Sequence, residues 1–187
     1  GPGWFRSVRR GGAQAVAGRL GTLARTQAPA DQDAGPSLVY TGVDFQRSLA
    51  GNLKRREMTF ADRVRTVYGP VDRWDATLDP DKPEQLGPRG AVLACDQLQV
   101  AETPAPGQPE RALELVAAGN TLVESAAYTA RASRLSYAEA KGLLILEGDG
   151  RADADLYCQQ RVGAEMQRFS ARRIYYWPAT NPVSYTH

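Results

Sequence analysis

Ala132-Ser-Arg-Leu-Ser-Tyr-Ala-Glu-Ala-Lys-Gly-Leu-Leu-Ile-Leu-Glu-Gly-Asp-Gly150 is the stretch that decides the fold of this chain. It predicts a strand, a turn and a second strand, because its helix-forming segment is too short to stand alone between two apolar runs. Its first half recurs at Cys95 and Ala171 as a small residue, two polar residues, an aliphatic residue and, two positions on, a second apolar residue. The three copies begin at residues 95, 132 and 171, so they lie 37 and 39 residues apart. This distance is within the period of roughly 20–50 residues that is typical of stacked repeats, so we expect stacked supersecondary units.

The composition is that of a globular chain rather than a disordered one. Of the 187 residues, 42% are hydrophobic and 24% are charged, and the net charge is +2. Such a small net charge gives no basis for a nucleic-acid partner. The sequence contains no run of about 18 apolar residues, the length that would predict a membrane-spanning helix. Residues 1–30 are nevertheless basic, and we expect either a solvated arm or one that meets phosphates. This segment carries Arg6, Arg9, Arg10, Arg19 and Arg25 without an acidic residue.

Strand signals extend over most of the chain and predict an all-β class. The expected strands are 37–45, 58–68, 91–100, 113–124 (broken near Gly119-Asn120), 128–137, 143–147, 152–159 and 167–177. Residues 10–36, 72–90 and 103–110 are expected loops, and the proline-dense ones should protrude from the sheet because proline cannot continue a ladder. We therefore divide the chain into a basic, loop-rich segment (1–36), a β-repeat domain (37–180) and the tail of a longer chain (181–187).

Alternation within the repeats predicts one polar and one apolar face, since residues two apart in a strand share a face. The apolar face should form two parallel columns, with a facing wall supplied by the strands around residues 113 and 144. The columns comprise Leu98, Val100, Leu135, Tyr137, Ile174 and Tyr176, and the facing wall comprises Leu113, Leu115, Leu144 and Leu146. The two walls could close into a sandwich core or stay splayed around a groove, and periodicity leaves both possibilities open.

The sequence offers little catalytic or metal-binding chemistry, and we predict a non-enzymatic protein without a cofactor or metal. The only histidine is the terminal His187, which removes most nucleophile–base schemes and the usual zinc sites. Cys95 and Cys158 fit either one disulfide or two small buried side chains. The acidic residues Glu147, Asp149, Asp153 and Asp155 fit an exposed charged face, or alternatively a calcium or polysaccharide site.

The stretch Ala132-Ser133-x-Leu135-x-Tyr137-x-x-Ala140-Lys141-x-Leu143-Leu144-Ile145-Leu146-x-Gly148-Asp149 resembles the central motif of the OstA-like/LptA family, a periplasmic lipopolysaccharide-transport domain. Phe169–Tyr176 resembles the next strand of that unit, and Val116–Val123 resembles its Gly-Asn-Val turn. The resemblance covers residues 91–177. Over 37–70 only the spacing of the motif residues matches the family, and residues 1–36 lie outside the resemblance. The long proline-rich insertions indicate a divergent member.

The resemblance implies an antiparallel β-jellyroll, or β-taco, that is open along one edge and holds the acyl chains of lipopolysaccharide or a similar glycolipid. The ten column and wall residues would then line the groove, and Arg134, Arg172 or the N-terminal arginines would meet phosphates. It further implies a periplasmic, outer-membrane-associated protein in outer-membrane biogenesis, with head-to-tail self-assembly or bridge-protein partners.

Two alternatives stay open beside this expectation. Tyr137 and Tyr176 are bulky and could plug the groove, which would leave a scaffold domain with a closed core. A polysaccharide-acting β-solenoid that uses the acids near Asp149 is the other alternative, and it requires a parallel coil.

Overall fold

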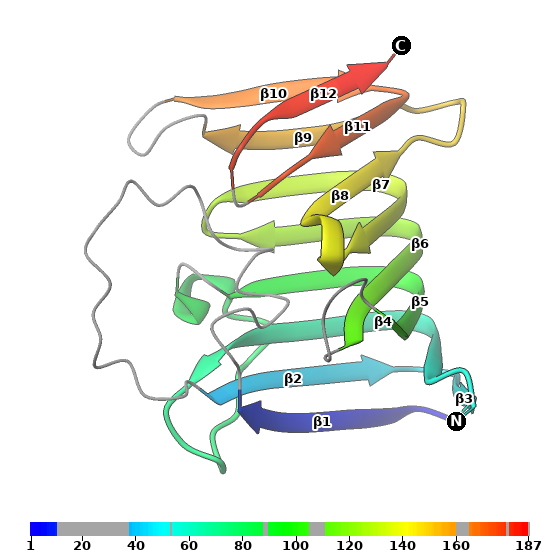
Figure 1. Cartoon of the computed structure of the whole chain (residues 1–187), viewed down its shortest axis with the longest axis vertical. Coiled ribbons are helices and arrows are strands. Elements are labelled where there is room, and N and C mark those ends of the chain that lie inside the picture. The colour runs from blue at the N-terminus through cyan, green and yellow to red at the C-terminus, as the bar shows by residue number, and fades with distance from the viewer. Residues whose placement is uncertain are drawn as a thin grey trace.

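The computed structural model describes residues 1–10, 38–52, 54–87, 90–104, 111–159, 165–178 and 180–186. These ranges form one 12-stranded sheet without an α-helix, in which every pairing is antiparallel (Figure 1). The strands are β1 (Gly3–Arg10), β2 (Leu38–Phe45), β3 (Ser48–Asn52), β4 (Glu57–Val71), β5 (Ala91–Pro104), β6 (Arg111–Ser125), β7 (Tyr128–Ala138), β8 (Leu143–Glu147), β9 (Ala154–Gln159), β10 (Met166–Ala171), β11 (Arg173–Tyr176) and β12 (Val183–Thr186). The predicted all-β, antiparallel, taco-like fold is confirmed, and a parallel β-solenoid is wrong for the described strands.

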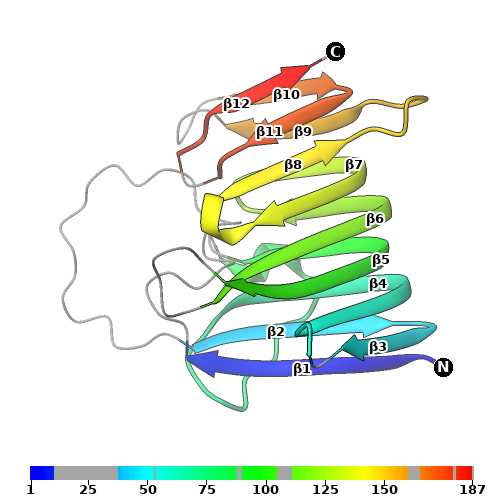
Figure 2. The same cartoon turned by 45° about the vertical axis from the view of Figure 1, so that its right-hand side comes forward.

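The long strands β4 to β7 each contribute to two walls. Their pairing registers shift between Ala61 and Val64, between Ala94 and Gln97, and between Ala118 and Thr121, and we call this line of shifts the crease. On one side of it lies wall A: β3, β8, β11, β12 and residues 57–61, 97–104, 111–118 and 134–138. On the other lies wall B: β1, β2, β9, β10 and residues 64–71, 91–94, 121–125 and 128–132. Figure 2 shows the layers stacked from β1 at one end to β12 at the other.

The repeated sequence signature marks the crease. Cys95, Ala132 and Ala171 each lie where the chain passes from wall B to wall A, and the aliphatic residue three positions later is the first inward residue of wall A. Strands that cross from wall A to wall B instead have residues with a positive φ at the crease. Asp62 and Arg63 on β4 have φ of 68° and 46°, and Gly119 and Asn120 on β6 have φ of 73° and 45°. These are β-bulges, which bend a strand without ending it, so β6 is continuous through Gly119-Asn120.

The inward residues form columns that run across the sheet. On wall A one column passes through Phe60, Leu98, Ala117, Leu135, Leu146 and Ile174, and the next through Met58, Val100, Leu115, Tyr137, Leu144 and Tyr176. The two predicted columns are therefore confirmed. The predicted facing wall is wrong, because Leu115, Leu144 and Leu146 belong to these same columns and Leu113 lies on the same wall. The residues that face them come from wall B: Val43, Thr66, Leu93, Val123, Ala130 and Leu156.

A second, smaller core lies on the outer side of wall B. Leu78 and Leu86, from the proline-rich segment after β4, pack against Leu38, Tyr40 and their neighbours. The Leu78 side chain packs so closely on the backbone of β4 that a Cβ at Gly69 would lie 2.9 Å from Leu78 Cδ1. The expectation that this segment protrudes is therefore wrong for residues 72–87, since its leucines cover the apolar outer face of β2, β4 and β5.

The sheet extends beyond both bounds of the predicted 37–180 domain. Residues 3–10 form β1 and pair with β2 along their whole length, and β12 pairs with β11. The alternation of Phe5 and Ser7 with charged Arg6 was the available signal for β1, but arginine density obscured it. Residues 11–37 and 105–110 lie outside the described ranges, as do Arg19, Arg25 and His187.

Candidate functional site

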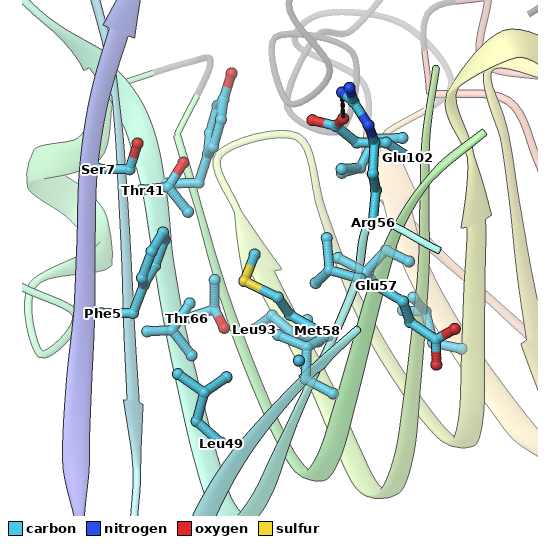
Figure 3. A pocket seen from close by; sticks show the side chains of 18 of the residues that line it. Phe5, Ser7, Thr41, Leu49, Arg56, Glu57, Met58, Thr66, Leu93 and Glu102 are labelled. Carbon is cyan, nitrogen blue, oxygen red and sulfur yellow. Dashed lines mark hydrogen bonds and ion pairs between the residues drawn. The ribbon is translucent and has the colours of Figure 1, made fainter. Parts of the chain in front are cut away.

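A cavity of about 750 Å³ lies between the two walls in the N-terminal half of the stack, and it is partly open. Wall B contributes side chains from β1, β2, β4, β5 and β6, and wall A contributes side chains from β3, β4, β5, β6 and β7 (Figure 3). The lining is mainly apolar. It includes Phe5, Val43, Leu49, Met58, Leu93, Leu98, Val100, Leu113, Leu115, Val123 and Leu135.

Polar groups border this apolar lining on the side away from the crease. Ser7 and Thr41 are register partners on wall B, and both line the cavity. On wall A, Arg56 Nη1 donates a hydrogen bond to Glu102 Oε2 over 3.3 Å, and both residues line the cavity (Figure 3). The cavity thus has an apolar interior and a polar rim, which is the arrangement expected of a site for an amphiphile.

The stack is closed in its C-terminal half because tyrosines replace smaller residues. In the second column of wall A, Met58, Val100 and Leu115 border the cavity, whereas Tyr137 and Tyr176 are 1% and 0% exposed. The ring of Tyr176 meets that of Tyr128 on wall B edge to face, with centroids 5.3 Å apart. The two rings fill the space between the walls at this end of the stack. Nearer to β1, the corresponding space is the cavity.

The ten predicted groove residues divide into two sets of five. Those bordering the cavity are Leu98, Val100, Leu113, Leu115 and Leu135. Those in the packed core are Tyr137, Leu144, Leu146, Ile174 and Tyr176, all at most 1% exposed. The first set lies on β5, β6 and β7 and the second on β7, β8 and β11, so the cavity ends within β7, between Leu135 and Tyr137. In the part of the chain described, the groove therefore spans only half of the stack.

Several cavity residues were not identified from the sequence. Phe5 and Ser7 belong to the unexpected strand β1, and Val43 lies in a predicted strand that was not assigned to a wall. Leu93 lies in the predicted strand of Leu98 and Val100 but on the other side of the crease, and it was not assigned with them. Met58 had a signal, because it lies two positions before Phe60 in an expected strand and so shares its face.

The two cysteines are free and buried, so the disulfide alternative is wrong and the alternative of small buried side chains holds. Burial raises the pKa of the Cys95 thiol to about 12, and the neighbouring Asp96 carboxylate acts in the same direction. Burial also raises the pKa of the Cys158 thiol. Both groups are protonated at neutral pH, in which form a thiol is neither a good nucleophile nor a metal ligand.

The acidic cluster is an exposed charged face held by arginines. Glu147 pairs with Arg134 and Arg173, and Asp155 Oδ1 lies 3.0 Å from Arg168 Nη2. Asp149 Oδ1 accepts the backbone N–H groups of Arg151 and Ala152, and these hydrogen bonds lower the pKa of the Asp149 carboxyl. No group of potential metal ligands occurs within the described ranges. Neither Arg134 nor Arg172 borders the cavity.

Replacing Tyr128 by phenylalanine is expected to leave stability unchanged or raise it by about 1–3 kcal/mol, the penalty for a buried polar group without a partner. Among the described residues the Tyr128 hydroxyl has no hydrogen-bond partner, and burial raises its pKa well above the ordinary value. The matched control is Tyr176→Phe, which removes the hydrogen bond that Tyr176 donates to Asn181 Oδ1 over 3.0 Å and should be destabilising. Urea unfolding measures both, and a stability loss in Tyr128→Phe equal to that in Tyr176→Phe would contradict this assignment.

In the described part of the chain, no helix is both long and apolar enough to cross a membrane. Compared with protein-family models and with curated proteins, the chain matches neither a family nor a relative.

Proposed function

We propose that this protein is a lipid-binding transport module that shelters acyl chains in the cavity between its walls. The observation that carries the proposal is the partly open, apolar-lined cavity of about 750 Å³. Ligand pockets in proteins span roughly 300–1,000 Å³, so the cavity accommodates chain-sized ligands. Each methylene removed from water contributes roughly 0.8 kcal/mol, so chains can be held without specific polar contacts.

Lipopolysaccharide, or a similar glycolipid, is the ligand class that the resemblance of residues 91–177 to the OstA-like/LptA family supports. The same resemblance supports a periplasmic location and non-catalytic carriage between membranes. The ends of the stack support assembly with further modules, since β1 has a sheet neighbour on one side only among the described strands. An unpaired strand edge can add another strand.

A scaffold role without a ligand is the second candidate, and the closed C-terminal half favours it. Five of the ten predicted groove residues are packed there, and the edge-to-face contact of Tyr128 with Tyr176 joins the walls. The two functions differ in one property, which is whether the N-terminal cavity takes up a lipid.

Leu115→Trp is expected to reduce uptake of fluorescent lipopolysaccharide at least about tenfold, because an indole on the cavity wall occupies the space of an acyl chain. Glu114→Trp is the matched control, since Glu114 is the preceding residue of β6, is exposed and points to the other side of the sheet. Native mass spectrometry after gentle extraction gives the second measurement, where wild-type protein should carry a species of glycolipid mass.

Lipid-free wild-type protein that also takes up no fluorescent lipopolysaccharide would refute the transport function and favour the scaffold. Equal uptake by the Leu115→Trp and Glu114→Trp variants would place the lipid outside the cavity.

A further inference from the structure

A basic turn lies at the rim of the cavity on wall A. Lys54, Arg55 and Arg56 follow β3 and precede β4, and all three are exposed. The turn is held by its backbone: Asn52 Oδ1 accepts the N–H of Arg55 over 3.1 Å, and the carbonyl of Arg56 accepts the N–H of Glu102 over 3.1 Å. Asn52 and Arg56, on either side of Lys54 and Arg55, both line the cavity. The turn is therefore fixed where a ligand would leave the apolar interior.

Two of the three cations in the basic turn have no counter-charge among the residues that the structure describes. Arg56 pairs with Glu102, and both side chains remain about half exposed, at 56% and 43%. For Lys54 and Arg55 the described residues supply no carboxylate within ion-pair distance. Arg134, Arg168 and Arg173 differ in this respect, because each of them is paired with an acidic side chain.

The opposite rim has a different character. The wall B residues that line the cavity at the same distance from the crease carry no formal charge: they are Tyr68, Ala91 and the register pair Ser7 and Thr41. Figure 3 shows Arg56 and Glu102 across the cavity from this pair. Among the described residues, the charged side chains at the rim are therefore on wall A, where Arg56, Glu57 and Glu102 line the cavity and the adjoining basic turn adds Lys54 and Arg55.

We propose that the basic turn Lys54–Arg56 binds the phosphate group of the same lipid whose acyl chains occupy the cavity. The inference rests on the proposed function, since chains held inside leave the headgroup at the rim. Lysine offers a compact positive charge and arginine a planar donor fork, and both bind phosphate oxygens through charge-assisted hydrogen bonds. Glu102 holds Arg56 at the rim and competes with the phosphate for its guanidinium.

The test compares dioctanoyl phosphatidic acid with dioctanoylglycerol, which has the same chains and no phosphate, by isothermal titration of the full chain. Wild-type protein should bind the phosphatidic acid about tenfold more tightly, or about 1.4 kcal/mol, and this preference should fall with added salt. The Lys54→Gln/Arg55→Gln variant should lose the preference and keep its affinity for dioctanoylglycerol. Glu102→Gln should increase the preference by freeing Arg56.

The matched control is Arg131→Gln/Arg151→Gln, which removes the same charge from two exposed positions that do not line the cavity. This variant should keep the wild-type preference. Equal binding of both lipids by wild-type protein would overturn the headgroup site and leave the cavity function standing, whereas failure to bind either lipid would overturn both.

Two further arms separate other sources of anion binding. Inorganic phosphate that binds as tightly as the phosphatidic acid would show a free-anion site unconnected with lipid chains. A Lys54→Gln/Arg55→Gln variant that loses binding only to phosphatidylglycerol vesicles, with its lipid preference unchanged, would show that the turn contacts a membrane surface. Either result would overturn the proposal.

Discussion

Leu144→Ala is expected to lower the free energy of unfolding by about 2–5 kcal/mol, the range for removing a fully buried leucine side chain. Leu144 is 0% exposed and lies between Tyr137 and Tyr176 in the second column of wall A. Leu115 belongs to the same column but borders the cavity and is only half-buried. Leu115→Ala should cost at most about 1.5 kcal/mol, since full burial of a leucine contributes about 1.5–3 kcal/mol. Urea unfolding of delipidated protein measures both.

This comparison tests whether the stack is open at one end and closed at the other. Both variants delete the same atoms from the same column, so the difference between them reports how the space opposite each leucine is filled. Equal losses of several kcal/mol would mean that the N-terminal half is packed in solution, and the scaffold function would then be favoured. A change in the urea dependence of either variant would point to an altered unfolded state instead.

Gly148→Ala is expected to destabilise the protein by about 1–3 kcal/mol or more, the cost of forcing backbone to shift in a packed region. A Cβ at Gly148 would lie 2.2 Å from the carbonyl oxygen of Ala152 and 3.1 Å from the Cα of Asp153. These are backbone atoms of the connection between β8 and β9, which the Asp149 carboxylate also holds through two hydrogen bonds of 2.8 Å. The new methyl group therefore has no flexible side chain to displace.

Gly51→Ala is the control for this substitution. Gly51 lies in the exposed strand β3, where a Cβ would meet only the carbonyl oxygen of Glu57, at 3.9 Å. Replacing glycine at a compatible position reduces the freedom of the unfolded chain and stabilises by about 0.4–1 kcal/mol. Thermal unfolding of the two variants should move in opposite directions. A neutral Gly148→Ala would show that the β8–β9 connection can rearrange.

The sequence predicted those features that depend on local periodicity. Alternation around Leu98, Leu135 and Ile174 correctly indicated which residues face inward and that they line up across strands. The sequence Gly148-Asp-Gly150 is typical of a turn, because glycine allows a positive φ, and Gly150 has a φ of 85°. Such features need no knowledge of which strand pairs with which.

Features that depend on pairing were not predictable in the same way. Alternation assigns Leu113 and Leu144 to the inner side but does not say on which wall they lie, because this depends on where each strand crosses the crease. Burial of Leu86 depends on an apolar outer face of wall B, which the long apolar run in β2 only hints at. The position of the cavity depends on packing across the walls, where Tyr128 meets Tyr176.

The crease also sets the way in which a chain of this design can grow. Each layer crosses the crease in the direction opposite to that of the layer before it. After two layers the backbone is therefore back on the wall where it began and runs in its original direction. Tandem duplication of the segment between two signature copies, such as Cys95 to Ala132, adds one such pair and leaves the pairing edges on either side unchanged. Length therefore increases in steps of two layers. The distance between the walls stays constant, because each added pair of layers repeats both kinds of corner, the small residue and the positive-φ bulge.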